Sequence, residues 1–226
     1  MRLQEAIKQT KALRVTLVLA GTLSAAWNGA VPGTHAQEKG RYNVDGPGSK
    51  VEIHVFKEGA FKMFGHDHLV AAKDISGEAH FDEQKIENAR VSLKIATHSI
   101  RVVDPGESEN DRQQVQATME GPKVLDVKQF PEITFTSERV SAARKTAEGW
   151  ELTVSGRLKL HGVEKTVSFP LRVHGDKGSV RGEGELSILQ TDYGITPVKV
   201  GGGTVKVKDK LRINFTIVAK LAGQES

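Results

Sequence analysis

Beyond residue 41 the chain alternates apolar and polar residues through most of its length. This period of two places successive side chains on opposite faces of a β-strand, one apolar and one polar. The longest run covers 205–219, where most odd positions are apolar and most even positions are Lys, Arg, Asn or Thr. Extended at ~3.3 Å per residue, this run would be about 50 Å long, which is more than a compact core requires.

Similar runs, separated by Gly-rich breaks, occur along the rest of the chain. The predicted strands are 51–56, 77–81, 91–97, 133–140, 150–160, 166–174, 180–189 and 205–219. Strands that each have one apolar face can close into a barrel, which removes exposed edges and leaves a packed core or a ligand cavity. We therefore predict an all-β fold, an extended eight-stranded antiparallel β-barrel.

Two local features qualify this pattern. His161-Gly162-Val163-Glu164 is short enough to join its flanking runs as a β-hairpin. Pro170 lies inside a predicted strand, so it indicates an edge, a bulge or a bend.

One segment, 108–128, departs from strand periodicity. Val115, Met119, Val124 and Leu125 recur in it at roughly helical spacing, and Pro122 is suited to open a second short helical turn. We predict a short helical insertion, which either lies across a barrel mouth or covers a strand edge.

The N-terminal 36 residues are typical of a secretory signal peptide. Basic residues come first, an apolar run of about a dozen residues follows from Val15, and Thr34 and Ala36 are the small residues expected before a cleavage site. A membrane-spanning helix needs ~20 apolar residues, so we expect cleavage and no integral membrane anchor. The expected division is a signal peptide at 1–36 and one β-barrel domain at 37–226, in the periplasm.

Charge and cysteine content limit the possible functions further. Without the leader, 28 basic and 27 acidic residues remain, and no basic cluster is interleaved with aromatics. Nucleic acid is therefore not an expected partner. The absence of cysteine excludes disulfides, thiolate metal sites and a lipidated N-terminal cysteine.

Four segments of the sequence, in order, are similar to those of a known family. They are Tyr42–Asp45 with Val51–Val55, then Phe130–Ser137, Gly156–Lys165 and Thr191–Ile195. In these segments the chain resembles the YceI-like periplasmic polyisoprenoid-binding proteins. The resemblance implies a lipocalin-like barrel that encloses a long isoprenoid tail, such as that of a quinone or a polyprenyl phosphate.

Strand parity predicts which side chains would line such an interior. The expected tunnel residues are Phe135, Val154, Leu158, Phe169, Leu186, Ile213 and Phe215. Gly182 and Gly184 share the inward parity, and they either make room for a ligand or relieve a tight bend. The candidates for a head-group site at the mouth are His66, His68, Asp192 and Tyr193. The family's usual Arg is missing near the last two, where Gln190 and Thr191 stand.

His66 and His68 raise an alternative, because imidazole is a common transition-metal ligand and both would point to one side of an extended segment. Two ligands do not complete a metal site, and His54 and His80 could add one only if strand pairing brought them near. We therefore expect no metal and no other cofactor. A metal-binding protein or metal-dependent enzyme that uses His66 and His68 is the second hypothesis, and a solidly packed structural module is the third.

No motif for catalysis is present, and a GxSxG nucleophile elbow is absent. The leading hypothesis is therefore a binding or carrier protein for an isoprenoid or similar lipid, with no catalytic residues. The sequence predicts neither the head group nor the oligomeric state.

Overall fold

The computed structural model describes residues 40–58, 67–200, 202 and 205–223. The predicted signal peptide and His66 lie outside these residues. The strands are β1 (Arg41–Val44), β2 (Lys50–Glu58), β3 (His68–Ala72), β4 (Ile75–His80), β5 (Arg90–Ala96), β6 (Arg101–Val102), β7 (Glu132–Thr146), β8 (Gly149–Leu160), β9 (Val163–Asp176), β10 (Ser179–Leu189), β11 (Lys199–Val200) and β12 (Val205–Leu221). The helices are α1 (Glu109–Glu120) and the short 3₁₀ turns η2 (Ile86–Asn88), η3 (Thr97–Ser99) and η4 (Thr191–Tyr193).

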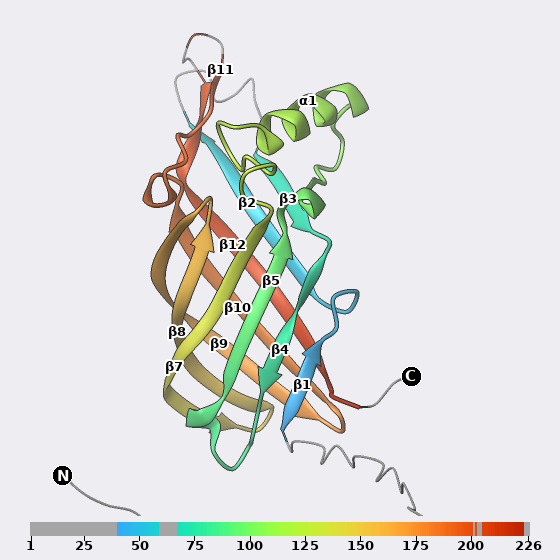
Figure 1. The fold of residues 1–226 in the computed structure, drawn as a ribbon, viewed down its shortest axis with the longest axis vertical. Coiled ribbons are helices and arrows are strands. Elements are labelled where there is room, and N and C mark those ends of the chain that lie inside the picture. The colour runs from blue at the N-terminus through green and yellow to red at the C-terminus, as the bar shows by residue number, and fades with distance from the viewer. Residues whose placement is uncertain (1–39, 59–66, 201, 203–204, 224–226) are drawn as a thin grey trace, which may run out of the picture. The chain divides into compact units, whose positions relative to one another are not determined.

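The strands form a closed antiparallel barrel (Figure 1), which confirms the predicted eight-stranded all-β fold. Five of its positions are single long strands, which neighbour one another in the order β7-β8-β9-β10-β12. Both β1 and β2 pair with β12. From there two rows, β1-β4-β5 and β2-β3-β6, extend around the barrel, and β5 pairs with β7 to close it. Three of the eight positions around the barrel are thus built from two shorter strands each.

The β8–β9 hairpin was predicted, and its turn follows from two residues with left-handed backbone. His161 has φ 50° and Gly162 has φ 76°, while Leu160 pairs with Val163. A two-residue loop with positive φ at both positions is a type I′ turn, whose twist matches the flanking strands. The aromatic ring of Phe130 lies against this turn, with its centroid 4.5 Å from that of His161.

Pro170 marks a strand edge. Pairing between β9 and β10 ends at Leu171 and Gly184, whereas β9 continues to pair with β8 as far as Val163. Proline has no N–H to donate, so it is suited to the point where a strand leaves its neighbour. The η4 turn packs beside β9 along the unpaired stretch, and Nδ1 of His161 lies 3.2 Å from the carbonyl oxygen of Tyr193.

The helical insertion forms α1, with Ser108 as its N-cap, whose side chain accepts a hydrogen bond from the N–H of Asp111. The prediction of a second helical turn at Pro122 was wrong. Residues 121–125 form hydrogen-bonded turns instead, with the N–H groups of Val124 and Asp126 both donating to the carbonyl of Gly121.

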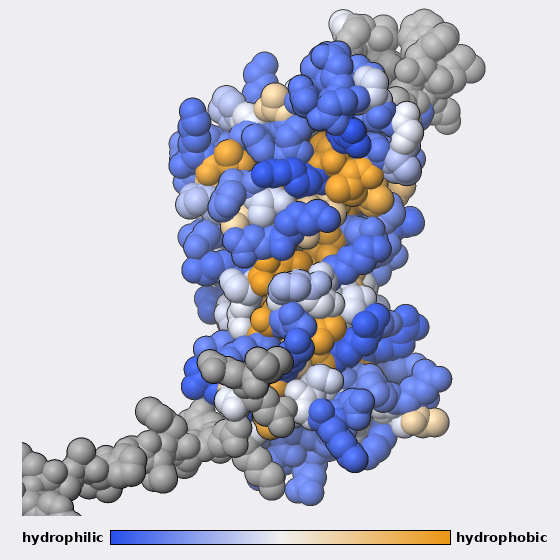
Figure 2. All heavy atoms as spheres, turned by 90° about the vertical axis from the view of Figure 1, so that its right-hand side faces the viewer, coloured by the Kyte–Doolittle hydropathy of each residue, from blue (hydrophilic) through white to orange (hydrophobic). Residues whose placement is uncertain are grey.

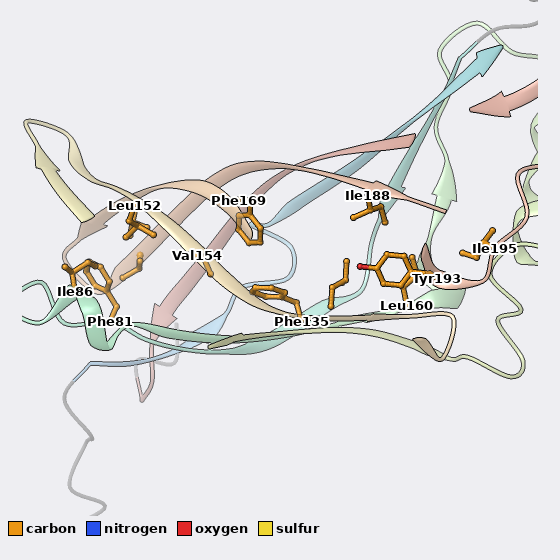
Figure 3. Packing of buried hydrophobic residues seen from close by; sticks show 13 residues of the cluster. Phe81, Ile86, Phe135, Leu152, Val154, Leu160, Phe169, Ile188, Tyr193 and Ile195 are labelled. Carbon is orange, nitrogen blue, oxygen red and sulfur yellow. The ribbon is translucent and has the colours of Figure 1, made fainter. Parts of the chain in front are cut away.

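Apolar side chains that face the barrel interior form two clusters. The larger one follows the long strands, and Figure 3 shows its members from Phe81 and Ile86 at one end to Tyr193 and Ile195 at the other. The smaller one lies beneath α1 and includes Val70, Ile100 and Val102. Polar side chains predominate on the outer face that Figure 2 shows, as the alternation predicts. Among the described residues, Leu189 is the one large apolar side chain that is exposed.

Candidate functional site

A cavity of about 620 Å³ occupies the barrel interior, and its walls are mostly aliphatic and aromatic side chains. All seven residues predicted from strand parity line it: Phe135, Val154, Leu158, Phe169, Leu186, Ile213 and Phe215. Val154, Leu158 and Phe169 are also buried from solvent. The structure thus places these side chains where the sequence indicated, and their contact with a lipid remains a prediction.

Three phenylalanines from non-adjacent strands meet in the interior. The ring centroids of Phe135 and Phe169 are 5.5 Å apart, and those of Phe169 and Phe215 are 5.3 Å apart with the rings nearly perpendicular. These residues lie on β7, β9 and β12, so each ring contact spans the one strand that lies between, β8 or β10. The three rings therefore form one aromatic cluster in the cavity wall.

The two inward glycines have different roles. A Cβ at Gly182 would lie 3.6 Å from the nearest atom of Leu171, an ordinary contact, and Gly182 lines the cavity. A Cβ at Gly184 would lie 2.7 Å from Cζ of Phe215 and 2.9 Å from the carbonyl of Pro170. Gly182 thus leaves room inside the cavity, whereas Gly184 lets the Phe215 ring lie against the barrel wall.

Charged side chains line the cavity only near its two ends, among the residues the structure describes. Lys57, His68 and Lys206 belong to the end covered by α1, and His80 and Arg90, which are paired across β4 and β5, belong to the other. The polar side chains of Gln114, Thr118 and Gln190 add to the α1 end. An apolar interior with polar ends is suited to an amphiphile that has a long chain.

The helix α1 covers both the mouth and an edge, so neither of the two predicted placements excludes the other. Its residues Val115 and Met119 line the cavity. On the same helix Gln116 pairs with the backbone of β6: its Nε2 donates to the carbonyl of Ile100 at 2.8 Å, and its Oε1 accepts from the N–H of Val102 at 2.9 Å. The helical spacing of Val115 and Met119 was the sequence signal for this cover, and nothing in the sequence singled out Gln116.

His68 lies at the α1 end of the cavity with two carboxylates that the sequence did not connect to it. Its Nδ1 is 2.6 Å from Oδ2 of Asp104 and 3.7 Å from Oε1 of Glu107. Oδ1 of Asp104 also accepts a hydrogen bond from the N–H of Leu69. The structure therefore brings His68 together with these acids and not with His54, which contacts Asn214 on the outer face. His80 lies at the opposite end.

The other two mouth candidates do not line the cavity. Asp192 is exposed, and Tyr193 is buried in the core with 1 % of its surface accessible. Figure 3 shows the Tyr193 ring near Leu160, with the hydroxyl directed into the barrel. Burial raises the pKa of Tyr193, and the charge of Asp192 raises it further. The structure gives no support to a head-group contact by either residue.

Gln190 is the polar residue of this turn that does reach the cavity. It is 5 % exposed, and its Nε2 donates to the carbonyl of Lys208 at 2.8 Å. Thr191, next to it, donates from its N–H and its hydroxyl to the carboxylate of Asp209. These hydrogen bonds lower the pKa of Asp209 and fix the turn to β12.

The closed antiparallel barrel and its apolar cavity define a lipocalin-like protein, a class built around an enclosed ligand site. Within that class the chain belongs to the family of the YceI-like domain, whose model matches residues 42–219. The fold supports a lipid-binding role. No curated protein matches the chain in sequence.

Solved structures with the same fold include proteins from three bacteria. BcnA of Burkholderia cenocepacia is 24 % identical with a TM-score of 0.61, and the match covers 78 % of this chain and 99 % of that one. A polyisoprenoid-binding domain from Saccharophagus degradans is 14 % identical with a TM-score of 0.56, covering 80 % and 98 %. The YceI protein of Campylobacter jejuni is 17 % identical with a TM-score of 0.51, covering 70 % and 85 %.

The described part of the chain contains no helix that is long and apolar enough to cross a membrane.

Proposed function

We propose that this protein is a periplasmic carrier that holds an isoprenoid or similar long-chain lipid in its barrel and catalyses no reaction. The observation that carries the proposal is the cavity of about 620 Å³, whose described lining is apolar along its length and charged only near its ends. Membership of the YceI-like family and the likeness to a polyisoprenoid-binding domain support the same ligand class.

The length of the cavity suits a membrane lipid. On β8 the lining extends from Leu152 to Leu160. Eight residue steps at ~3.3 Å give ~26 Å, which a strand tilt of ~40° shortens to roughly 20 Å along the barrel axis. One leaflet of a bilayer contributes ~15 Å of hydrocarbon. A lipid chain therefore fits lengthwise.

The head group belongs at the α1 end of the barrel. The α1 end has more polar groups, namely Lys57, His68, Lys206, Gln114, Thr118 and Gln190. The other end has His80 and Arg90 beside the buried apolar side chains of Phe81 and Ile86. Buried polar groups need hydrogen-bond partners, so a polar head group is better accommodated beneath α1. The chain tail then extends past the phenylalanines towards Phe81.

Mass spectrometry of organic extracts from the purified protein tests the ligand directly. We expect a co-purified lipid with a long isoprenoid or similar chain. Phe215→Lys would place an ammonium in the apolar interior and should abolish lipid retention, because an unpaired buried charge costs several kcal/mol or more. The matched control is Thr216→Lys on the outer side of β12, beside Glu183 and Lys50, which should retain lipid.

Two results would contradict the proposal. One is a folded protein that neither contains lipid nor takes up an added long-chain isoprenoid. The other is lipid that stays bound equally well in the folded Phe215→Lys variant.

The periplasmic location follows from the leader at 1–36. We expect export and cleavage after Ala36, and N-terminal sequencing of the exported protein checks both. A product that still begins at Met1 would contradict this part of the proposal.

A further inference from the structure

Strand pairing places an imidazole directly opposite a buried carboxylate at the α1 end of the barrel. β3 and β6 pair with Val70 opposite Val102, and the N–H of Val103 donates to the carbonyl of Leu69 beyond the end of β6. The next residue pair in this register, one step beyond Leu69 and Val103, is His68 and Asp104. The 2.6 Å separation of His68 Nδ1 and Asp104 Oδ2 is the result.

Glu107 approaches the same nitrogen from the loop that leads into α1. The ligand atoms of His68, Asp104 and Glu107 all lie within 4.8 Å of one another. Asp104 is 4 % exposed, and the side chain of Glu107 is 6 % exposed. Within this trio two carboxylates face one imidazole, so their charges sum to −1 even when His68 is protonated. A divalent cation in place of the proton brings the summed charge of the trio to zero.

We propose that His68, Asp104 and Glu107 bind a divalent transition-metal ion of the zinc class. Zinc bonds to nitrogen and carboxylate oxygen are ~2.0–2.2 Å, so tetrahedral ligand atoms lie roughly 3.4 Å apart. Glu107 Oε1 is already 3.7 Å from Nδ1, and the shorter His68–Asp104 contact has to open by less than about 1 Å as the proton between them leaves. Imidazole favours zinc, copper or nickel over magnesium and calcium.

The surroundings of the trio resemble those of bound metals. The N–H of Leu69 holds the second oxygen of Asp104, the kind of outer hydrogen bond that orients a ligating carboxylate. Three protein ligands leave a fourth position for water or another oxygen. Because His68 also lines the cavity, the ion would lie beside its polar end. The metal site does not depend on whether the cavity holds lipid.

Titration of zinc chloride into the chelator-treated protein by isothermal calorimetry tests the site, with plasma mass spectrometry of dialysed protein for stoichiometry. We expect one zinc per chain and a higher Tm when zinc is bound. His68→Gln and Glu107→Gln should each weaken binding by at least about 10-fold, since even an outer-shell change costs that much. The matched controls are His80→Gln at the other end of the cavity and Glu109→Gln on the exposed start of α1, which should bind zinc as the original chain does.

Circular dichroism and the Tm of the metal-free protein show whether each variant is folded. Loss of zinc binding is interpreted only for variants that are folded. The proposal is overturned if the folded original chain binds no stoichiometric zinc, copper or nickel. It is equally overturned if folded His68→Gln and Glu107→Gln bind the ion unchanged, or if binding depends on His66 alone.

Discussion

Truncation of Phe215 distinguishes a ligand tunnel from a solid core. In this structure its ring contacts Phe169 on one side and lies against Gly184 on another, and the remaining surface faces the cavity. Phe→Ala in a fully packed core costs ~3–5 kcal/mol, because the change removes the transfer free energy and leaves a void. Part of the Phe215 ring already borders the empty cavity, so truncation removes fewer packing contacts than it would in a solid core.

We therefore expect Phe215→Ala to lower the free energy of unfolding of the lipid-free protein by ~1.5–3 kcal/mol, including ~0.5–1.5 kcal/mol for the ring pair with Phe169. Lipid retention should fall several-fold, because the ring would contact a bound chain. Urea unfolding and mass spectrometry of the same preparation measure both. Thr216→Ala on the outer face is the control and should change stability by less than about 1 kcal/mol. A loss of ~3–5 kcal/mol with unchanged bound lipid would refute the tunnel assignment at Phe215.

Three further outcomes are expected. Gly162→Ala should cost ~1–2 kcal/mol in urea unfolding, because φ is positive there and the new Cβ would lie 2.6 Å from the Phe130 ring; an unchanged midpoint would contradict the turn geometry. Because the pKa of Tyr193 is raised in the folded state, its neutral hydroxyl contributes to the free energy of unfolding below pH 10.0, and this contribution is lost as the pH rises through the raised pKa. Tyr193→Phe should therefore flatten the decline of unfolding free energy above pH 10, and identical profiles would contradict this. Gln116→Ala should speed hydrogen exchange in α1 and release of lipid.

Alternation predicted the long strands and the inward side of each. With a period of two, one correctly assigned inward residue fixes the direction of every other side chain in the strand. It missed β3, whose sequence His68-Leu69-Val70-Ala71-Ala72 is a continuous apolar run after the histidine and has no alternation. It also missed β6, whose two residues are too few to show a period. Both short strands are set by their neighbours and not by their own sequence.

The trio at the α1 end depends on those two strands, which explains why the sequence did not predict it. Asp104 and His68 are 36 positions apart and meet only through the β3–β6 register. The sequence instead paired His68 with His66 by parity. In the same way Tyr193 was expected at the mouth as part of the family-like turn Thr191–Ile195, yet it packs in the core.

We expect the attachment of α1 to set how readily a bound lipid can leave. None of its residues is fully buried, and its contacts with the barrel include the packing of Val115 and Met119 and the two hydrogen bonds of Gln116 to the edge of β6. At a net ~0.5–1.5 kcal/mol each they contribute ~1–3 kcal/mol, and losing ~2 kcal/mol raises the open population about 30-fold. In Gln116→Ala, faster exchange should be confined to α1 while global stability stays within about 1 kcal/mol of the original. Gln113→Ala is the control, because the exposed Gln113 side chain donates to Glu109 on the same helix. If exchange in α1 and lipid release were the same in both variants, α1 would not be the element that closes the cavity.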